Sequence, residues 1–145
     1  MRALYGVRHA FGCSSGTAAV HIALGALAIE PGREVITSAI TDMGSLTGVL
    51  YQLLIPRFAD IEAFVEMGRR HGIPVIEDCA QAHHTMWKGR LVGTFAAVLT
   101  DRNDIEERIR LFIDTCCFRD GRKRNPYFLA PNYQMTEMQG AVANA

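Results

Sequence analysis

The sequence predicts an α/β fold, because strand-like and helix-like apolar segments alternate along it. Short apolar runs bounded by turn residues, such as Ile73–Glu77, are typical of buried strands, whereas a long apolar stretch such as Ala18–Glu30 is typical of a helix. The order strand, helix, strand favours parallel pairing with right-handed crossovers. The 145 residues are enough for a single domain with its own core.

Composition argues against several classes of protein. The 15 basic and 15 acidic residues balance, so no nucleic-acid-binding surface is expected, and the basic cluster Arg119–Arg124 reads as a solvated loop. No apolar run is long enough to span a bilayer, and Met1–Ala10 lacks the apolar core of a secretory signal. The four cysteines lack metal-ligand spacing, so we expect free thiols and a cytoplasmic location.

The first candidate site is the small-residue turn Phe11–Thr17, which leads into the helix Ala18–Glu30. This helix is apolar on almost every face and is therefore expected to be buried. Its start carries Ser15, Gly16 and Thr17, whose hydroxyls and free backbone N–H groups suit a phosphate. The alternative is an ordinary Ser/Thr N-cap without a ligand.

The remaining elements follow from the same patterns. His21 is expected to pack in the core rather than to bind a ligand. Capping boxes are expected at Asn103 with Glu106 and at Thr136 with Gln139. The further expected elements are strands at Glu34–Thr37, Ile55–Phe58 and Phe95–Thr100, and helices at Ser45–Leu54, after Asp60, after Asn103 and after Thr136.

The second candidate site is the carboxylate that follows the strand Ile73–Glu77. Open α/β sheets bind ligands at the carboxyl ends of their strands, so Asp78 is placed to face a bound molecule. The alternative is that Asp78 only caps the next helix. His83 and His84 are adjacent and point different ways, so a shared metal ion is not expected there.

Four stretches, in the same order, resemble the DegT/DnrJ/EryC1/StrS family of pyridoxal-phosphate-dependent aminotransferases, most of which aminate nucleotide-linked sugars or cyclitols. Gln134 stands where the family signature has arginine. The stretches are Gly12–Ala19, Ile73–His83, Val98–Asp101 with the helix after it, and Pro131–Gln139. The resemblance implies part of the three-layer α/β/α large domain of fold-type I transferases, with a mostly parallel sheet and no small domain. Residues 1–145 would form one incomplete domain.

The resemblance also implies a cofactor site for pyridoxal 5'-phosphate, completed in relatives by a homodimer partner. The phosphate would lie at the helix start, Asp78 would pair with the protonated pyridine nitrogen, and Gln81 would bind the phenolic oxygen. Asp42 stands where relatives often carry an aromatic residue that stacks on the ring. The implied cofactor-binding residues are Ser15, Gly16, Thr17, Asp78, Gln81 and Asn132.

The lysine that links the cofactor covalently in relatives is missing. Gly93–Phe95 runs almost directly into Ala97–Thr100, where relatives carry it, and a longer family segment is missing near Asp60. Lys88 and Lys123 occupy other positions, although rescue by Lys88 is conceivable. We therefore expect an aminotransferase-family chain without amino-transfer activity, which holds the cofactor non-covalently at best. Relatives act on an amino donor and a keto-sugar or cyclitol.

Two other functions stay open: a non-catalytic phosphate-binding module and an oligomerising remnant with exposed sheet edges. A dinucleotide-binding domain is weakly supported, because Gly12 and Gly16 do not complete the glycine fingerprint.

Overall fold

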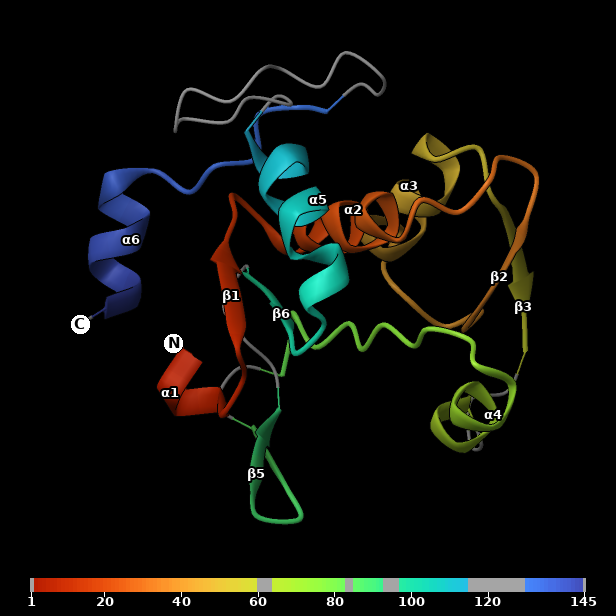
Figure 1. The fold of residues 1–145 in the computed structure, drawn as a ribbon, viewed down its shortest axis with the longest axis horizontal. Helices are drawn as coiled ribbons and strands as arrows, with labels where there is room; N and C mark the ends of the chain where they lie inside the picture. Colours follow the sequence, from red (N-terminus) through yellow and green to blue (C-terminus); the bar gives the residue numbers. More distant parts are fainter. Residues whose placement is uncertain (1, 60–63, 83–84, 93–96, 115–129, 145) are drawn as a thin grey trace.

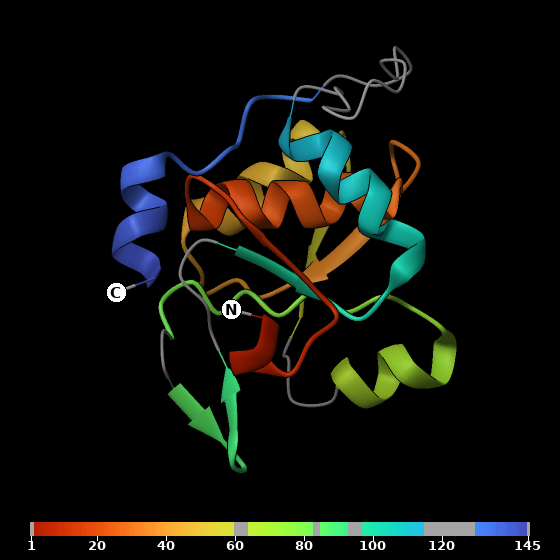
Figure 2. The ribbon, with the colours of Figure 1, turned by 60° about the vertical axis from the view of Figure 1, so that its left-hand side comes forward.

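The computed structural model describes residues 2–59, 64–82, 85–92, 97–114 and 130–144, and these form an α/β fold (Figures 1 and 2). No helix in these ranges is both long and apolar enough to cross a membrane. The helices are α1 (Arg2–Tyr5), α2 (Gly16–Leu27), α3 (Met43–Tyr51), α4 (Phe64–His71), α5 (Asn103–Ile113) and α6 (Glu137–Asn144). The strands are β1 (His9–Gly12), β2 (Glu34–Thr37), β3 (Ile55–Phe58), β4 (Thr85–Trp87), β5 (Arg90–Val92) and β6 (Ala97–Thr100).

Helix α2 lies at the centre of the molecule, between α3 and α5 (Figure 1). Ser15 caps its start, where the Oγ accepts a hydrogen bond of 3.1 Å from the N–H of Ala18. It ends earlier than the expected Glu30, because Ala28 adopts a left-handed conformation with φ of 52°. The expected burial of this apolar helix is confirmed.

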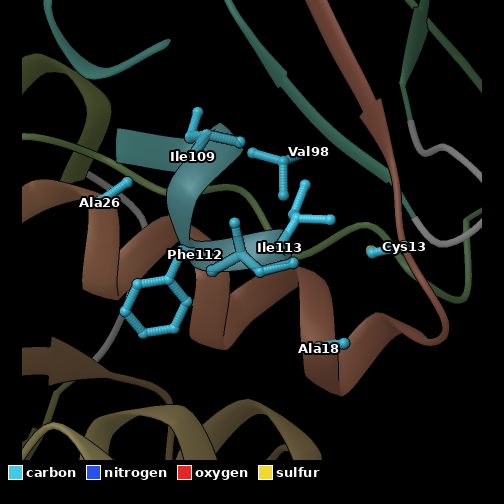
Figure 3. Packing of buried hydrophobic residues seen from close by; sticks show 8 residues of the cluster. Cys13, Ala18, Ala26, Val98, Ile109, Phe112 and Ile113 are labelled. Carbon is cyan, nitrogen blue, oxygen red and sulfur yellow. The ribbon is translucent and has the colours of Figure 1, made fainter. Parts of the chain in front are cut away.

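The main core lies between α2, α5 and β6 (Figure 3). Ile22 of α2 and Ile109 of α5 are fully buried, and Phe112 lies against Gly25 so closely that a Cβ there would overlap the ring. The smaller cluster on the other side of α2 consists of Val20, Leu24, Val49 and Leu54.

A buried polar network joins α2 to α3 and to the C-terminal segment. His21 is only 5% exposed, which confirms its expected place in the core. The side-chain amide nitrogen of Gln52 donates to Nε2 of His21, and Nδ1 of His21 therefore donates to the Tyr133 hydroxyl, both at 2.8 Å. The network requires a neutral imidazole, and burial lowers the pKa of His21 below its ordinary value.

The strands form three separate pairs within the described part of the chain. Strands β2 and β3 are parallel, with Glu34 opposite Ile55. Strands β1 and β6 are antiparallel, as are β4 and β5, which are joined by the turn at Lys88 and Gly89 with φ of 47° and 75°. The α/β class is confirmed, but the expected mostly parallel arrangement is met only by β2–β3.

The expected buried strand at Ile73–Glu77 is wrong as stated. Residues 73–79 have no regular secondary structure, and Ile73 and Val75 are 56% and 47% exposed. A strand needs neighbours that satisfy its backbone groups. Here a cavity of about 780 Å³ is lined both by residues 74–80 and by β6, and no ladder in the described residues includes this segment.

The two expected capping boxes have different outcomes. At the start of α6, the N–H of Thr136 donates to Oε1 of Gln139 at 2.9 Å and the N–H of Gln139 donates to Oγ1 of Thr136, as expected. At the start of α5 the box is wrong: Arg102 is the N-cap residue and makes no side-chain cap. The side-chain oxygen of Asn103 instead contacts Nε2 of His9 at 2.7 Å, and Glu106 pairs with Arg110.

The Gly25→Ala variant tests the α2–α5 contact. We expect overpacking against Phe112 to cost about 1–3 kcal/mol, more than the gain of about 1 kcal/mol in helix propensity, so the free energy of unfolding falls. Urea denaturation measures this change. Gly140→Ala is the control, because no atom lies within 4 Å of a Cβ built at Gly140 of α6. That variant should be neutral or stabilising, and equal effects of both substitutions would contradict the packing argument.

The buried imidazole of His21 predicts a pH-dependent stability. Because its pKa is lower in the folded protein, the unfolded chain takes up the proton first as pH falls below the ordinary value of 6.5. The free energy of unfolding should therefore fall between a pH of about 7.5 and about 5.5, and His21→Gln should flatten this dependence. Urea titrations at both pH values measure it. The control His71→Gln, at an exposed position, should keep the wild-type slope.

Candidate functional site

The start of α2 and the segment around Asp78 meet in space, although more than sixty residues separate them in the sequence. A Cβ built on Gly16 would lie 2.7 Å from the Cβ of Ala80. Only glycine therefore allows this approach without a shift. Gly16, Asp78 and Ala80 all line the 780 Å³ cavity. One residue from each expected half, Gly16 and Asp78, thus lies at the same cavity, which α2 also lines through Ala19, Val20 and Ala23.

The first turn of α3 joins these two halves. Asp42 is its N-cap residue and accepts a hydrogen bond of 2.7 Å from the N–H of Gly44. Gly44 lies against Thr17, and a Cβ at this position would collide with the Thr17 Oγ1. The next residue, Ser45, donates its hydroxyl to the Asp78 Oδ2 at 2.5 Å. Consecutive residues of one helix therefore contact Thr17 and bond to Asp78.

Asp78 is an exposed carboxylate whose two oxygens each accept a hydrogen bond. The Oδ2 accepts from Ser45, and the Oδ1 accepts from the N–H of Ala80 at 3.2 Å. The second bond is a local turn contact, and residues 79–82 are not helical, so the helix-capping alternative for Asp78 does not hold. No basic side chain in the described ranges forms an ion pair with it. This carboxylate is open to a cationic partner.

Ser15 serves as an N-cap, which is the alternative that the sequence left open for this residue. Its Oγ is used by Ala18 of the same helix. The N–H groups of Gly16 and Thr17 stand in the first turn, where N–H groups have no partner within the helix. The small size of Gly16 serves its contact with Ala80 as well as any approach by a ligand.

Gln81 and Asn132 are less directly connected to this centre. Gln81 is exposed in the turn after Asp78, and neither residue is among the described residues that line the cavity. The Asn132 Oδ1 accepts a hydrogen bond of 3.1 Å from the N–H of Gln134. The segment around Asn132 does reach the phosphate turn, because the N–H of Ser14 donates to the carbonyl oxygen of Tyr133 at 2.9 Å.

Sequence reasoning missed Ser45, because its role depends on a contact across 33 positions in the chain.

Other reactive groups near the site offer little alternative chemistry. Burial raises the pKa of the Cys13 thiol to about 11, which keeps it protonated. The described residues contain no cluster of three metal-ligating side chains, and His83 and His84 lie outside them.

The model of the DegT/DnrJ/EryC1/StrS aminotransferase family matches residues 1–64 and 54–100 of this chain. The match is split into two pieces that overlap over residues 54–64, around the position near Asp60 where a family segment is expected to be missing. The identity with relatives is moderate. The chain is 28% identical, over 194 aligned positions, to a putative L-glutamine:3-amino-2,3-dideoxy-scyllo-inosose aminotransferase from Micromonospora echinospora. It is 27% identical, over 198 positions, to a GDP-perosamine synthase from Caulobacter vibrioides.

These alignments cover 94% and 97% of this chain but only 46% and 52% of the relatives, so the chain spans about half their length. The first alignment is longer than the chain itself, so at least 49 of its positions (194 − 145) have no residue here. The expected internal gaps agree with this excess.

Solved structures share the fold. S. venezuelae DesV, solved in complex with a ketimine intermediate, matches with a TM-score of 0.82 at 26% identity, over 99% of this chain and 53% of DesV. NtdA from Bacillus subtilis with bound cofactor PMP matches with a TM-score of 0.81 at 20% identity, over 98% of this chain and 44% of NtdA. The split family match and these likenesses show that the chain belongs to the DegT/DnrJ/EryC1/StrS aminotransferase family.

Proposed function

We propose that this chain binds pyridoxal 5'-phosphate or its amine form non-covalently and does not complete amino transfer. The observation that carries the proposal is that Gly16, at the start of α2, and Asp78 line one cavity, while the first turn of α3 contacts Thr17 and bonds to Asp78. The start of α2 would bind the phosphate, through the N–H groups of Gly16 and Thr17 and the favourable end of the helix dipole. Asp78 would bind the pyridine nitrogen.

The donor set fits the two ends of such a cofactor. Each Asp78 oxygen already accepts one hydrogen bond and keeps a lone pair for a further donor. A fixed carboxylate beside the pyridine nitrogen keeps that nitrogen protonated. When bound, the protonated ring supplies an electron sink for the substrate carbon. Asp42, at the N-cap of α3, gives no aromatic stacking surface, so ring contacts would be weaker than in relatives that have one.

The sequence supports the absence of amino transfer. No lysine stands between Gly93 and Thr100, where relatives carry the one that anchors the cofactor and moves the proton. Lys88 lies in the β4–β5 turn, with its Nζ 5.4 Å from the centre of the Trp87 ring, and also lines the cavity. We propose that it does not replace the missing lysine. Substrates named for relatives, such as keto-sugars and cyclitols, would not be turned over by this chain. We also propose a cytoplasmic location, because the spacing of the four cysteines does not indicate a disulfide framework.

Calorimetry with pyridoxamine phosphate tests the binding proposal. The wild-type chain should bind it, and Asp78→Ala should weaken binding about tenfold or more, because hydrogen bonds to charged groups contribute about 1.5–3 kcal/mol. Glu30→Ala is the control and should bind like wild type, since it removes an exposed carboxylate that does not line the cavity. Absent binding, or equal binding by wild type and Asp78→Ala, would refute this use of the site.

Borohydride reduction after loading with pyridoxal phosphate tests the missing covalent link. We expect no labelled lysine peptide, because no lysine occupies the family position. Mass spectrometry of the digested protein provides the measurement. A label on Lys88 that Lys88→Arg abolishes would show that this lysine has taken over the anchoring role.

We also propose a second candidate function, assembly with a second copy of the chain. Large apolar side chains are exposed on the β2–β3 pair, where Ile36, Ile55 and Phe58 are 51%, 45% and 55% exposed. Open strand edges and apolar surface of this kind favour association. Sedimentation should show a homodimer that Phe58→Asp dissociates. A folded monomer at all accessible concentrations would remove this candidate.

A further inference from the structure

We propose that Ser45 is a positioning residue that fixes the carboxylate of Asp78 for the ring nitrogen of a bound pyridoxamine or pyridoxal phosphate. This inference rests on the proposed function and adds to it the side chain that orients the key carboxylate. Ser45 is one of the two described groups that bond to Asp78, and its 2.5 Å contact is the shorter.

The direction of the hydrogen bonds around Ser45 supports this role. An ionised carboxylate only accepts, so Ser45 must donate its single proton to the Asp78 Oδ2. The Ser45 oxygen is then free to accept, and the Thr41 hydroxyl donates to it at 3.2 Å. Thr41, Ser45 and Asp78 therefore form a chain of two hydrogen bonds, in which Thr41 donates to Ser45 and Ser45 donates to Asp78. This chain of hydrogen bonds fixes the orientation of the Asp78 carboxylate but transfers no proton to the carboxylate.

The position of Ser45 is itself fixed from both sides. Asp42 caps the helix one turn before it, through the N–H of Gly44. Gly44 lies directly against Thr17 of α2, which leaves α3 little freedom to slide. A one-residue shift of α3 would break both contacts. The start of α2 and the orientation of Asp78 are therefore coupled through two consecutive residues of α3.

Three variants separate this role from a general effect on α3. Ser45→Ala removes the donor, and Ser45→Thr keeps a hydroxyl. Thr47→Ala is the matched control, because the Thr47 hydroxyl donates to the Met43 carbonyl oxygen within the same helix at 2.8 Å. Calorimetry should show weaker pyridoxamine phosphate binding for Ser45→Ala, by about tenfold, as expected for a lost bond to a charged group. Ser45→Thr and Thr47→Ala should bind like wild type.

A second probe tests whether Ser45 acts through Asp78. A pyridoxamine phosphate analogue with carbon in place of the ring nitrogen has no protonated nitrogen that could pair with Asp78. Ser45→Ala and wild type should bind this analogue equally. The double variant Ser45→Ala/Asp78→Ala should bind pyridoxamine phosphate no more weakly than Asp78→Ala alone.

The outcomes separate the two proposals. If wild type does not bind pyridoxamine phosphate, the proposed function fails and this inference fails with it. If wild type binds and Asp78→Ala weakens binding while Ser45→Ala does not, only the positioning role is overturned. An equal loss for Ser45→Ala with both probes also overturns it, because the effect would then bypass the ring nitrogen.

Discussion

The burial of α2 is the interaction on which the rest of the structure depends. An apolar helix can be stable in water only when neighbouring elements cover its faces. Here α5 covers one face through Phe112, which lies on Gly25, and α3 covers another through Val49. Because α2 is fixed by these contacts, its N-terminus has a fixed direction. That direction is what turns a small-residue loop into a candidate phosphate site.

The candidate site is built from helices more than from a sheet. In the described residues the strand ladders contain only two strands each, and the segment before Asp78 joins none of them. Asp78 nevertheless stays beside the start of α2, because Ala80 contacts Gly16 and Ser45 holds the carboxylate. Helix packing thus preserves an arrangement that a continuous sheet would otherwise provide.

Patterns within single segments predicted several elements. The apolar run of α2, the strands Glu34–Thr37 and Ile55–Phe58 and the capping box at Thr136 are all present, although the two strands pair across 21 positions (55 − 34) and α2 is covered by the distant α5. The predicted strand at Ile73–Glu77 would also need a partner strand elsewhere in the chain. No ladder in the described residues includes this segment, and its apolar pattern alone could not show that. The side chain of Asn103 likewise does not form the predicted cap, because it contacts His9, 94 positions away. Ser45 could not be found from its own neighbourhood, because its partner is Asp78.

The two departures from the family pattern act on different parts of the proposed chemistry. The missing lysine removes the group that would anchor a cofactor covalently and carry its proton, whereas Asp42 in place of an aromatic residue removes a stacking surface. The hydrogen bonds among Thr41, Ser45 and Asp78 do not involve the missing lysine, and Asp42 supports them as the N-cap residue of α3, through the N–H of Gly44. In the proposed function, cofactor binding and amino transfer would therefore depend on separate residues. Loss of amino transfer would leave the geometry proposed for binding in place.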